Sequence, residues 1–469
     1  MLPLVEFPEI VQHYAPHFQS VFSPEAYVQF QRYLSGLLVS HNKTVDGINR
    51  LFVIEPRHQS SLNRLLTESP YSDTALNQAR LALLASLPGT QLKPKGVLSI
   101  DDTLLTHYGQ HFEHIAYLYD PAQDRYAWAH NLVNLHYSDD HTDYPLAFQL
   151  WKPADLEGIE QGLRAAGIPL KAAKLPLKTE APKKWRQYLL GVWRRHQNKP
   201  AVAALYESKL VIARKLLSAW VTEHPDLNLP VTFDSWYTQP AFCRFIDREL
   251  QLPYVGTLTN DAKVILKSGQ ETLEHFAQRL KEEHLQAIDA GQPGLFRKIG
   301  VGFKGQKEIY YSYCGTHRVH NFGKQRLVIN HGRADLSDAP KFYNSNRLRW
   351  QAPGISRIRR HRWPVEVYHE EGKAEGLDQY QVRAFKAVYR HIALVAVAYS
   401  LLRAIPHDEA LFRKLRRQLE FNLNGSAPFW RRITLAQSIW SLSCFIAAGL
   451  AQGQHLPDLM APVLATLCN

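Results

Sequence analysis

Residues 362–373 read RWPVEVYHEEGK, and three of their charged side chains are spaced by turns of a helix. Arg362 and Glu366 are four residues apart, and Lys373 follows Glu366 after a further seven. On a helix, intervals of one and two turns place all three side chains on one face. A solvated helix with an Arg–Glu pair has the same pattern. We therefore predict a helix over residues 357–372 whose charged face is either solvated or part of a site.

Two aspartate motifs follow apolar runs that are typical of buried strands. Residues 97–100 lead into Asp101, Asp102 and Thr103, and residues 229–233 lead into Asp234. Carboxylates at the ends of adjacent strands can meet where ligand sites tend to form in a sheet. Such oxygen ligands suit Mg²⁺, and two ions roughly 4 Å apart can activate an attacking oxygen and stabilise a leaving one. A single Asp at a strand end is more often a turn cap.

Taken together, these segments resemble DDE transposases of bacterial insertion sequences. Residues 362–373 match the family signature of Arg, three residues, Glu, six residues and Lys. Residues 101–103 are similar to its first Asp motif and residues 232–237 to its second, and the three motifs occur in the family's order. Each motif is common by chance, whereas the ordered set with helical spacing is fairly specific. The resemblance covers most of the chain after residue 90.

The resemblance implies an α/β fold, a ribonuclease H-like catalytic core with a β-rich insertion between the second Asp and the Glu. It also implies metal ligation and catalysis by Asp102, Asp234 and Glu366, with Mg²⁺ as the cofactor and Mn²⁺ as its substitute. We prefer Asp102 to Asp101 because the family's ligand directly precedes a Thr. Adjacent residues of a strand face opposite ways, so only one of the two can point at the site.

Four further residues are implied to bind DNA. Arg362 and Lys373 match the basic positions of the signature, which hold phosphates beside the metals. The full signature has a Tyr three residues before the Arg, and this chain has Arg359 there, which removes the aromatic contact and adds a phosphate-binding charge. Some members stack a flipped base on an aromatic residue of the insertion, where Phe342 is comparably placed and Trp350 lies nearby. A core position is the alternative for both aromatic residues.

The chain is strongly basic, which favours an anionic partner. Its 469 residues contain 55 Lys and Arg against 43 Asp and Glu, giving a formal net charge of +12. The 45% of apolar residues excludes a mainly disordered chain. Ten of the cations lie in a proline-punctuated insert at residues 161–199, beside the single acid Glu180. A solvated loop and a contact with the DNA backbone are both open for this insert.

The patterning predicts a core flanked by helical domains. Residues 1–90 have apolar residues at helical spacing and would form an N-terminal DNA-binding domain, in which Lys43 and Arg50 would help to recognise terminal repeats. The core would comprise residues 91–261 and 346–403, the β-rich insertion residues 262–345, and a helical C-terminal domain residues 404–469. Three strand-like runs after residue 97 predict an antiparallel meander inside the core.

We predict a transposase that cuts DNA at the ends of its element and transfers the cut strands into target DNA. Its partners would be double-stranded DNA, both terminal inverted repeats and target, and a second copy in a homodimeric synaptic complex. One alternative is a non-catalytic DNA-binding protein derived from a transposase, acting as a repressor or architectural factor. Another is a structure-selective nuclease on the same fold, which cleaves but does not join.

The sequence favours a bacterial cytoplasmic protein associated with the nucleoid and without membrane contact. The first ten residues contain acids and a proline and do not resemble a signal peptide. The most apolar stretch, residues 392–402, is shorter than the roughly 20 residues that a membrane span requires.

Overall fold

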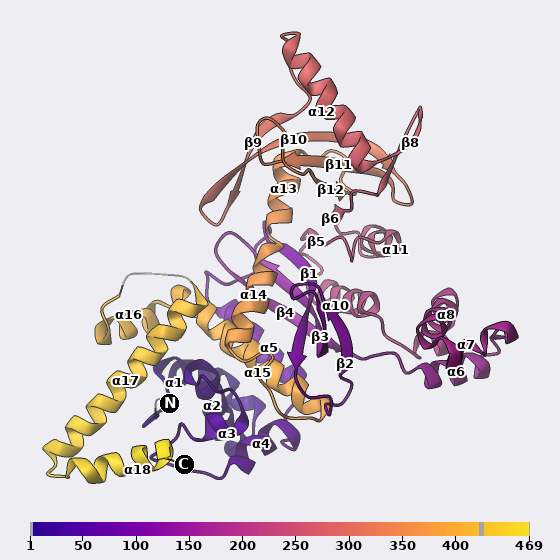
Figure 1. The fold of residues 1–469 in the computed structure, drawn as a ribbon. Coiled ribbons are helices and arrows are strands. Elements are labelled where there is room, and N and C mark those ends of the chain that lie inside the picture. The colour runs from indigo at the N-terminus through magenta and orange to yellow at the C-terminus, as the bar shows by residue number, and fades with distance from the viewer. Residues whose placement is uncertain (1–2, 422–425, 469) are drawn as a thin grey trace.

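The computed structural model describes residues 3–421 and 426–468, and its central feature is a large mixed sheet (Figure 1). The core part of the sheet has the strand order β4–β3–β1–β5–β6. Strands β1, β3 and β4 are antiparallel neighbours, whereas β5 runs parallel to both β1 and β6. This order is ribonuclease H-like, so the predicted α/β fold is confirmed. The strands are β1 (Val97–His107), β3 (Arg125–Ser138), β4 (Asp143–Trp151), β5 (Val231–Phe233) and β6 (Tyr254–Leu258).

The predicted meander is confirmed by the register of its strands. Strand β1 pairs along its whole length with β3, and β3 pairs with β4 across the polar turn at residues 139–142. Aromatic and β-branched residues fill these strands because they pack well on a pleated, buried surface. One strand was not predicted: β2 (Ala116–Asp120) pairs with the outer end of β3 and leaves Tyr117 and Tyr119 exposed.

Helices cover both faces of the core sheet. Helix α14 (Trp363–Ala374) packs against β1, β3 and β4, and α10 (Lys209–Glu223) packs against β3 and β4. Because adjacent residues of β1 point to opposite faces, Asp101 contacts Arg362 before α14 and Asp102 contacts Lys209 in α10. The other helices of the core are α11 (Pro240–Arg244), the π-helical turn η3 (Phe245–Glu249), α13 (Ala352–Arg360) and α15 (Phe385–Ala404).

The β-rich insertion continues the core sheet instead of forming a separate one. Strand β12 pairs with the core strand β6, and the order then runs β12–β11–β10–β7–β8, with β9 beside β10. A long helix, which the sequence did not predict, covers this part of the sheet (Figure 1). The elements are β7 (Lys263–Leu266), β8 (Gly269–Thr272), α12 (Leu273–Asp289), β9 (Arg297–Phe303), β10 (Gln306–Val319), β11 (Gly323–His331) and β12 (Lys341–Ser345).

The basic insert is helical, which excludes the first of its two alternatives, a solvated loop. Its prolines begin helices instead of interrupting them, because proline fits the first helical turn, where its missing N–H has no partner to lose. Pro182 begins one helix and Pro200 another. The helices are α6 (Leu156–Ala165), η2 (Ala172–Lys174), α7 (Leu177–Glu180), α8 (Pro182–Arg195) and α9 (Pro200–Ala203).

The terminal helices share one apolar core with the catalytic sheet. Helices α2, α4 and α5 pack around α15, which is buried along most of its length. Helices α17 and α18 pack against each other and extend away from the sheet (Figure 1). The elements are α1 (Glu9–Tyr14), η1 (Ala15–Val21), α2 (Pro24–Val39), α3 (Val45–Asn49), α4 (Gln59–Thr67), α5 (Asp73–Ser86), η4 (Ile405–His407), α16 (Glu409–Gln418), α17 (Ala427–Ala451) and α18 (Leu456–Cys468).

Lys43 cannot contact DNA, contrary to our expectation for the N-terminal helices. Its side chain is 1% exposed, and its ammonium donates a hydrogen bond to the carbonyl of Leu37. Burial lowers the pKa of Lys43 to about 7, although the nearby Glu375 carboxylate opposes this shift. Arg50 forms an ion pair with Asp46 one turn away. The N-terminal DNA-binding role therefore loses one of its two predicted cations.

Two helices in the described part of the chain are long and apolar enough to cross a membrane by length and composition alone. Helix α15 contributes to one of them, and 89% of that window is buried inside the protein, as expected for a core helix. Helix α17 is different, because only 22% of its window is buried. A single exposed apolar helix is weak evidence for a membrane, but its surface needs an explanation.

Candidate active site

Asp101 and Asp234 are neighbours across two parallel strands. In the pairing of β1 with β5, Ile100 lies beside Phe233, and each aspartate is the next residue along its strand. Side chains at matched positions of parallel strands point to the same face of the sheet. The backbone N–H of Tyr237 donates a 3.1 Å hydrogen bond to Oδ1 of Asp234, which fixes this carboxylate at the turn after β5. The strand register therefore brings Asp101 and Asp234 together.

Glu366 lies on the same face of the sheet as Asp101, and Arg362 contacts both carboxylates. One terminal guanidinium nitrogen of Arg362 lies 2.5 Å from Oδ2 of Asp101, and the other contacts Glu366. Two carboxylates from distant parts of the chain thus bind opposite ends of one planar cation. Each carboxylate uses one oxygen, and the guanidinium bridges the two acids through its two terminal nitrogens. The arrangement places Glu366 within the span of one guanidinium from Asp101.

The helix that carries Glu366 is shorter than predicted. We expected one helix over residues 357–372, whereas α13 ends at Arg360 and α14 begins at Trp363. Pro364 explains the break, since its ring would clash with the carbonyl of residue 360 in a continuous helix. As a result, Arg362 caps the start of α14, and Glu366 lies in its first turn.

Asp101 is a buried acid among other charges. Burial is the main cause that raises the pKa of Asp101 to about 7, and the carboxylates of Asp234 and Asp102 add to the rise. The guanidinium of Arg362 opposes the shift. The contribution of Asp234 agrees with the strand register, which puts this residue beside Asp101. A cation is therefore favoured on this face of the sheet.

Asp102, which we preferred as the metal ligand, points to the other face of β1. Its carboxylate accepts hydrogen bonds from the ammonium of Lys209 at 2.9 Å, the hydroxyl of Tyr237 at 2.8 Å and the amide of Asn131 at 2.6 Å. The alternation of side chains along a strand that we used to exclude one of the two aspartates therefore disfavours Asp102. Its contacts link β1, β3, α10 and the turn that follows Asp234.

A cleft of about 560 Å³ lies beside Arg362 and Glu366, between the insertion and helices α13 and α14. Arg359 lines it, and Nε of Arg359 donates a 2.8 Å hydrogen bond to the hydroxyl of Thr257. Burial and the charge of Arg362 lower the pKa of Arg359 to about 10, against the opposing charges of Asp101 and Asp234. Lys341, Arg360 and Trp363 also line this cleft, and the sequence analysis did not identify any of them.

Phe342 is a core residue. It is 1% exposed and packs with the apolar residues of the insertion, between Ile329 on β11 and Leu258 on β6. Its position argues against base stacking, because a stacking platform must present an open ring face. Trp350 packs beside the smaller core under α13. By contrast, Trp363 is 48% exposed at the cleft.

Lys373 lies two turns beyond Glu366 on α14. Its charge helps to lower the pKa of His369, an effect that is due first to burial. The amide of Asn134 on β3 contacts the ring of His369 at 2.9 Å and so fixes this part of α14 on the sheet. In the part of the chain that the structure describes, Lys373 has no carboxylate partner within ion-pair distance, so its charge is available to an external anion.

No set of three or more His, Cys, Asp or Glu side chains within residues 3–421 and 426–468 is arranged closely enough to hold a metal ion. Arg362 lies between Asp101 and Glu366 and pairs with both, so its single positive charge is shared by two carboxylates. The acids therefore share one cation of the protein itself in this arrangement.

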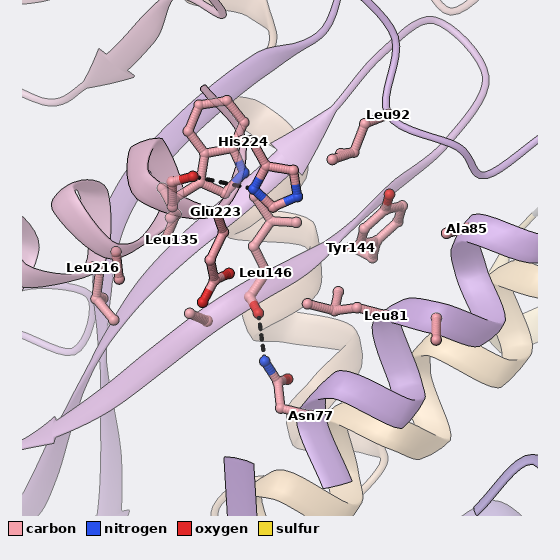
Figure 2. Close-up of a pocket in the computed structure, with 14 residues that line it drawn as sticks. Asn77, Leu81, Ala85, Leu92, Leu135, Tyr144, Leu146, Leu216, Glu223 and His224 are labelled. Carbon is pink, nitrogen blue, oxygen red and sulfur yellow. Dashed lines mark hydrogen bonds between the residues drawn. The ribbon is translucent and has the colours of Figure 1, made fainter. Parts of the chain in front are cut away.

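A second cavity of about 320 Å³ lies away from these acids, between α5, β4 and α10 (Figure 2). Its lining is mainly apolar, and its polar groups are largely satisfied within the protein. The amide of Asn77 donates to the carbonyl of Leu146, and the ring of His224 contacts the carbonyl of Trp220. Glu223 is the acid in this lining. The lining of this cavity thus lacks the Lys and Arg side chains that line the cleft.

Comparisons with known proteins agree with the geometry. A family model described as DDE superfamily endonuclease matches residues 17–275, and one described as transposase DDE domain matches residues 157–401. Each match spans more than half of the chain. The first includes Asp101 and Asp234, and the second includes Asp234 and Glu366. A search of curated proteins gives no match. The chain belongs to the DDE superfamily of transposases and endonucleases.

Proposed function

We propose that this chain is the transposase of a bacterial insertion sequence, which cuts DNA at the ends of its element and joins them to target DNA. The observation that carries the proposal is that three acids from distant segments gather around Arg362 on one face of the core sheet. Asp101 and Asp234 adjoin across β1 and β5, and Arg362 links Asp101 to Glu366. A protein that only binds DNA has no need for three acids beside a basic cleft, because they repel phosphates.

Asp101, Asp234 and Glu366 would hold the divalent cations, with Asp101 in place of Asp102. The residues fit hard cations, since they offer carboxylate oxygens, and the buried Asp101 already has a cationic partner in Arg362. Mg²⁺ is the natural choice, and Mn²⁺ takes the same oxygen ligands. Bound ions would supply Lewis acidity and neutralise charge at a scissile phosphodiester. Arg362 becomes available to DNA phosphates once its two carboxylates have another cation.

The other residues of the cleft would hold the DNA. Lys341 of the insertion and Arg359 and Arg360 of α13 line the cleft, and Lys373 adds a cation two turns beyond Glu366 on α14. In the first reaction, water attacks the scissile phosphorus and the bond to the 3′ oxygen breaks. The released 3′ hydroxyl then attacks a phosphorus of the target in line, which forms a new phosphodiester while the target's bond to its own 3′ oxygen breaks and leaves a 3′ hydroxyl. The acids form no covalent intermediate in either reaction.

The proposal is tested by incubating the purified chain with DNA that carries the inverted repeats flanking its gene. With Mg²⁺ or Mn²⁺ we expect cuts at the repeat ends, and with EDTA we expect none. DNA of the same length and scrambled repeat sequence is the control. Tight binding to the repeats without cutting, in either metal, would favour the non-catalytic alternative of a repressor or architectural factor. Cutting without joining to target DNA would favour the structure-selective nuclease.

We further propose that the active form is a homodimer in the bacterial cytoplasm, held together by α17 and α18. Residues 433–457 contain no Asp, Glu, Lys or Arg, and the exposed apolar residues there include Ile439, Trp440 and Leu450. A large exposed apolar patch that is surrounded by polar residues is typical of a protein interface. A second copy is the favoured occupant, because joining two element ends requires two active sites and a twofold interface uses the same patch twice.

Replacing Trp440 by Glu should convert the dimer to a monomer, because a charge would be buried in the apolar interface. Light scattering coupled to size-exclusion chromatography measures the molar mass directly. We expect twice the chain's 53.8 kDa for the unchanged protein and 53.8 kDa for the variant. Ile288→Glu is the matched control, since Ile288 is 53% exposed on α12, and its mass should stay that of the dimer. Equal masses for both variants would refute this interface.

A further inference from the structure

The helices of the basic insert form a separate small module (Figure 1). It has its own apolar core, in which Ile159 and Leu163 of α6 pack with Trp185 and Leu189 of α8. The module is connected to the core by residues 152–155 after β4 and by residues 204–208 before α10. A folded unit with its own core holds its surface residues in fixed positions, which a solvated loop does not. The charges of this unit therefore have a defined arrangement.

This module carries more than half of the net charge of the chain. Residues 156–203 contain ten Lys and Arg against three Glu, a net charge of +7 out of the chain's +12. Two of the cations, Arg164 and Lys178, pair with Glu160. The other eight are exposed and have no carboxylate partner within ion-pair distance in the described part of the chain. They are Lys171, Lys174, Lys183, Lys184, Arg186, Arg194, Arg195 and Lys199.

Helix α8 is amphipathic, with apolar residues on one face and basic residues on the other. Its buried residues are spaced by one helical turn and point into the module, as Trp185 and Leu189 do. Two basic pairs, at residues 183–184 and 194–195, lie on the opposite face. They are eleven residues apart, which is three turns, so the pairs face the same way about 16 Å apart along the axis. A rigid row of unpaired cations is suited to a polymer with regularly spaced phosphates.

The second connection joins the module to the core sheet beside β1. Residues 204–208 lead directly into α10, whose first residue, Lys209, contacts Asp102 on the face of β1 opposite Asp101. Five residues span at most about 18 Å. The module therefore begins within that distance of Lys209, which is shorter than one helical turn of duplex DNA at about 34 Å. The contact of Trp151 with Tyr206, 3.0 Å between Nε1 and the hydroxyl, further anchors this side of the module.

We propose that the α6–α9 module is a second DNA-binding site, which grips the backbone of the duplex beside the cut without reading its sequence. The inference rests on the proposed function and extends it to a surface outside the catalytic cleft. The partner is double-stranded DNA. A membrane is disfavoured, because the module exposes few large apolar side chains, with Leu175 at 38% the main one.

The test uses the full-length chain and a labelled 40-base-pair duplex of random sequence in EDTA, with affinity measured over a range of salt concentrations. The variant is R194Q/R195Q, which removes two exposed arginines from the last turn of α8. The matched control is R416Q/R417Q, two exposed arginines in the last turn of α16. If each arginine of α8 contacts one phosphate, the slope of log affinity against log salt should fall by about two for the variant. We expect no change for the control.

Equal slopes for the two variants would overturn the inference, as would a loss of binding to RNA duplex or anionic vesicles that exceeds the loss for DNA. K183Q/K184Q provides a second variant, and its slope should fall in the same way. Melting temperatures close to that of the unchanged protein would show that both variants are folded, since all four side chains are exposed. The binding measurement needs neither metal nor inverted repeats. Its result is therefore independent of the cutting assay, and either proposal can fail while the other holds.

Discussion

Replacing Glu366 by Gln should abolish DNA cutting and leave DNA binding largely intact. Gln keeps the size of the side chain and removes the charge that a cation requires. Loss of one metal ligand should remove several kcal/mol of charge stabilisation in the transition state, and about 4 kcal/mol corresponds to a thousandfold lower rate. The positive face of the cleft stays in place, so the affinity for DNA should change little. The rate of cutting on repeat DNA in Mg²⁺ measures the first effect, and gel shift in EDTA measures the second.

Glu370→Gln is the matched control for this variant. Glu370 lies one turn further along α14 and is exposed, so it differs from Glu366 in position but not in chemistry. Its replacement should leave the cutting rate within about twofold, as for most surface substitutions. Cutting by the Glu366 variant at the rate of the control would remove Glu366 from the site and the transposase proposal with it.

Asparagine substitutions at Asp101 and Asp102 should have very different effects on DNA cutting. Asp101→Asn should abolish cutting to the same extent as Glu366→Gln, because Asp101 faces Asp234 and Arg362. Asp102→Asn should retain cutting within about tenfold, because its carboxylate lies on the other face of β1. The two residues are adjacent and equal in charge, so each variant controls for the other. Cutting that survives in the Asp101 variant and is lost in the Asp102 variant would restore the expectation from the sequence.

Asp102→Asn, which should affect cutting less than Asp101→Asn, should affect the stability of the protein more. Asp102 accepts hydrogen bonds from Lys209, Tyr237 and Asn131, so Asn at this position leaves some of these donors without an acceptor. The free energy of unfolding should fall by about 1 to 3 kcal/mol. In Asp101→Asn, removal of a buried acid that repels Asp234 should cost less. Thermal unfolding of both variants gives this comparison independently of activity.

Asp101 and Asp102 show that the sequence can predict the strand ends that carry the acids but not the register that brings them together. Both apolar runs were readable as strands, and each ends in an acid, Ile100 before Asp101 and Phe233 before Asp234. Matching the first acid after each run would have selected Asp101. We instead relied on the following Thr in the family motif. The pairing of β1 with β5 favours Asp101, because Ile100 pairs with Phe233, and such a register depends on contacts between segments about 130 residues apart in the chain.

Local signals also existed for features that the sequence analysis missed. Pro364 marks the start of α14, because proline fits the first turn and excludes a helix that continues from residue 360. In the basic insert, Trp185, Leu189, Val192 and Trp193 have the spacing of a buried helix face. We left this segment open between a solvated loop and a DNA contact, and we did not use its apolar period. The folded module was therefore not predicted.

Burial of single residues was beyond the reach of the sequence. Lys43 was expected to contact DNA, and Phe342 was left open between base stacking and a core position, yet both are 1% exposed. Lys43 is covered where the N-terminal helices meet the rest of the apolar core, and Phe342 is covered by β6 and β11 on either side. These environments come from tertiary packing, which no local pattern encodes. The same holds for Trp363, whose exposure at the cleft follows from the position of the insertion.

The most direct test of the central claim is the binding of Mn²⁺ to the free protein at pH 8, measured by calorimetry. Burial raises the pKa of Asp101 to about 7, so this carboxyl is mainly ionised at pH 8, and affinity should fall as the pH drops below 7. We predict that the unchanged protein and Asp102→Asn bind Mn²⁺, and that Asp101→Asn, Asp234→Asn and Glu366→Gln do not. Binding of Mn²⁺ that persists in Asp101→Asn and disappears in Asp102→Asn would contradict the account.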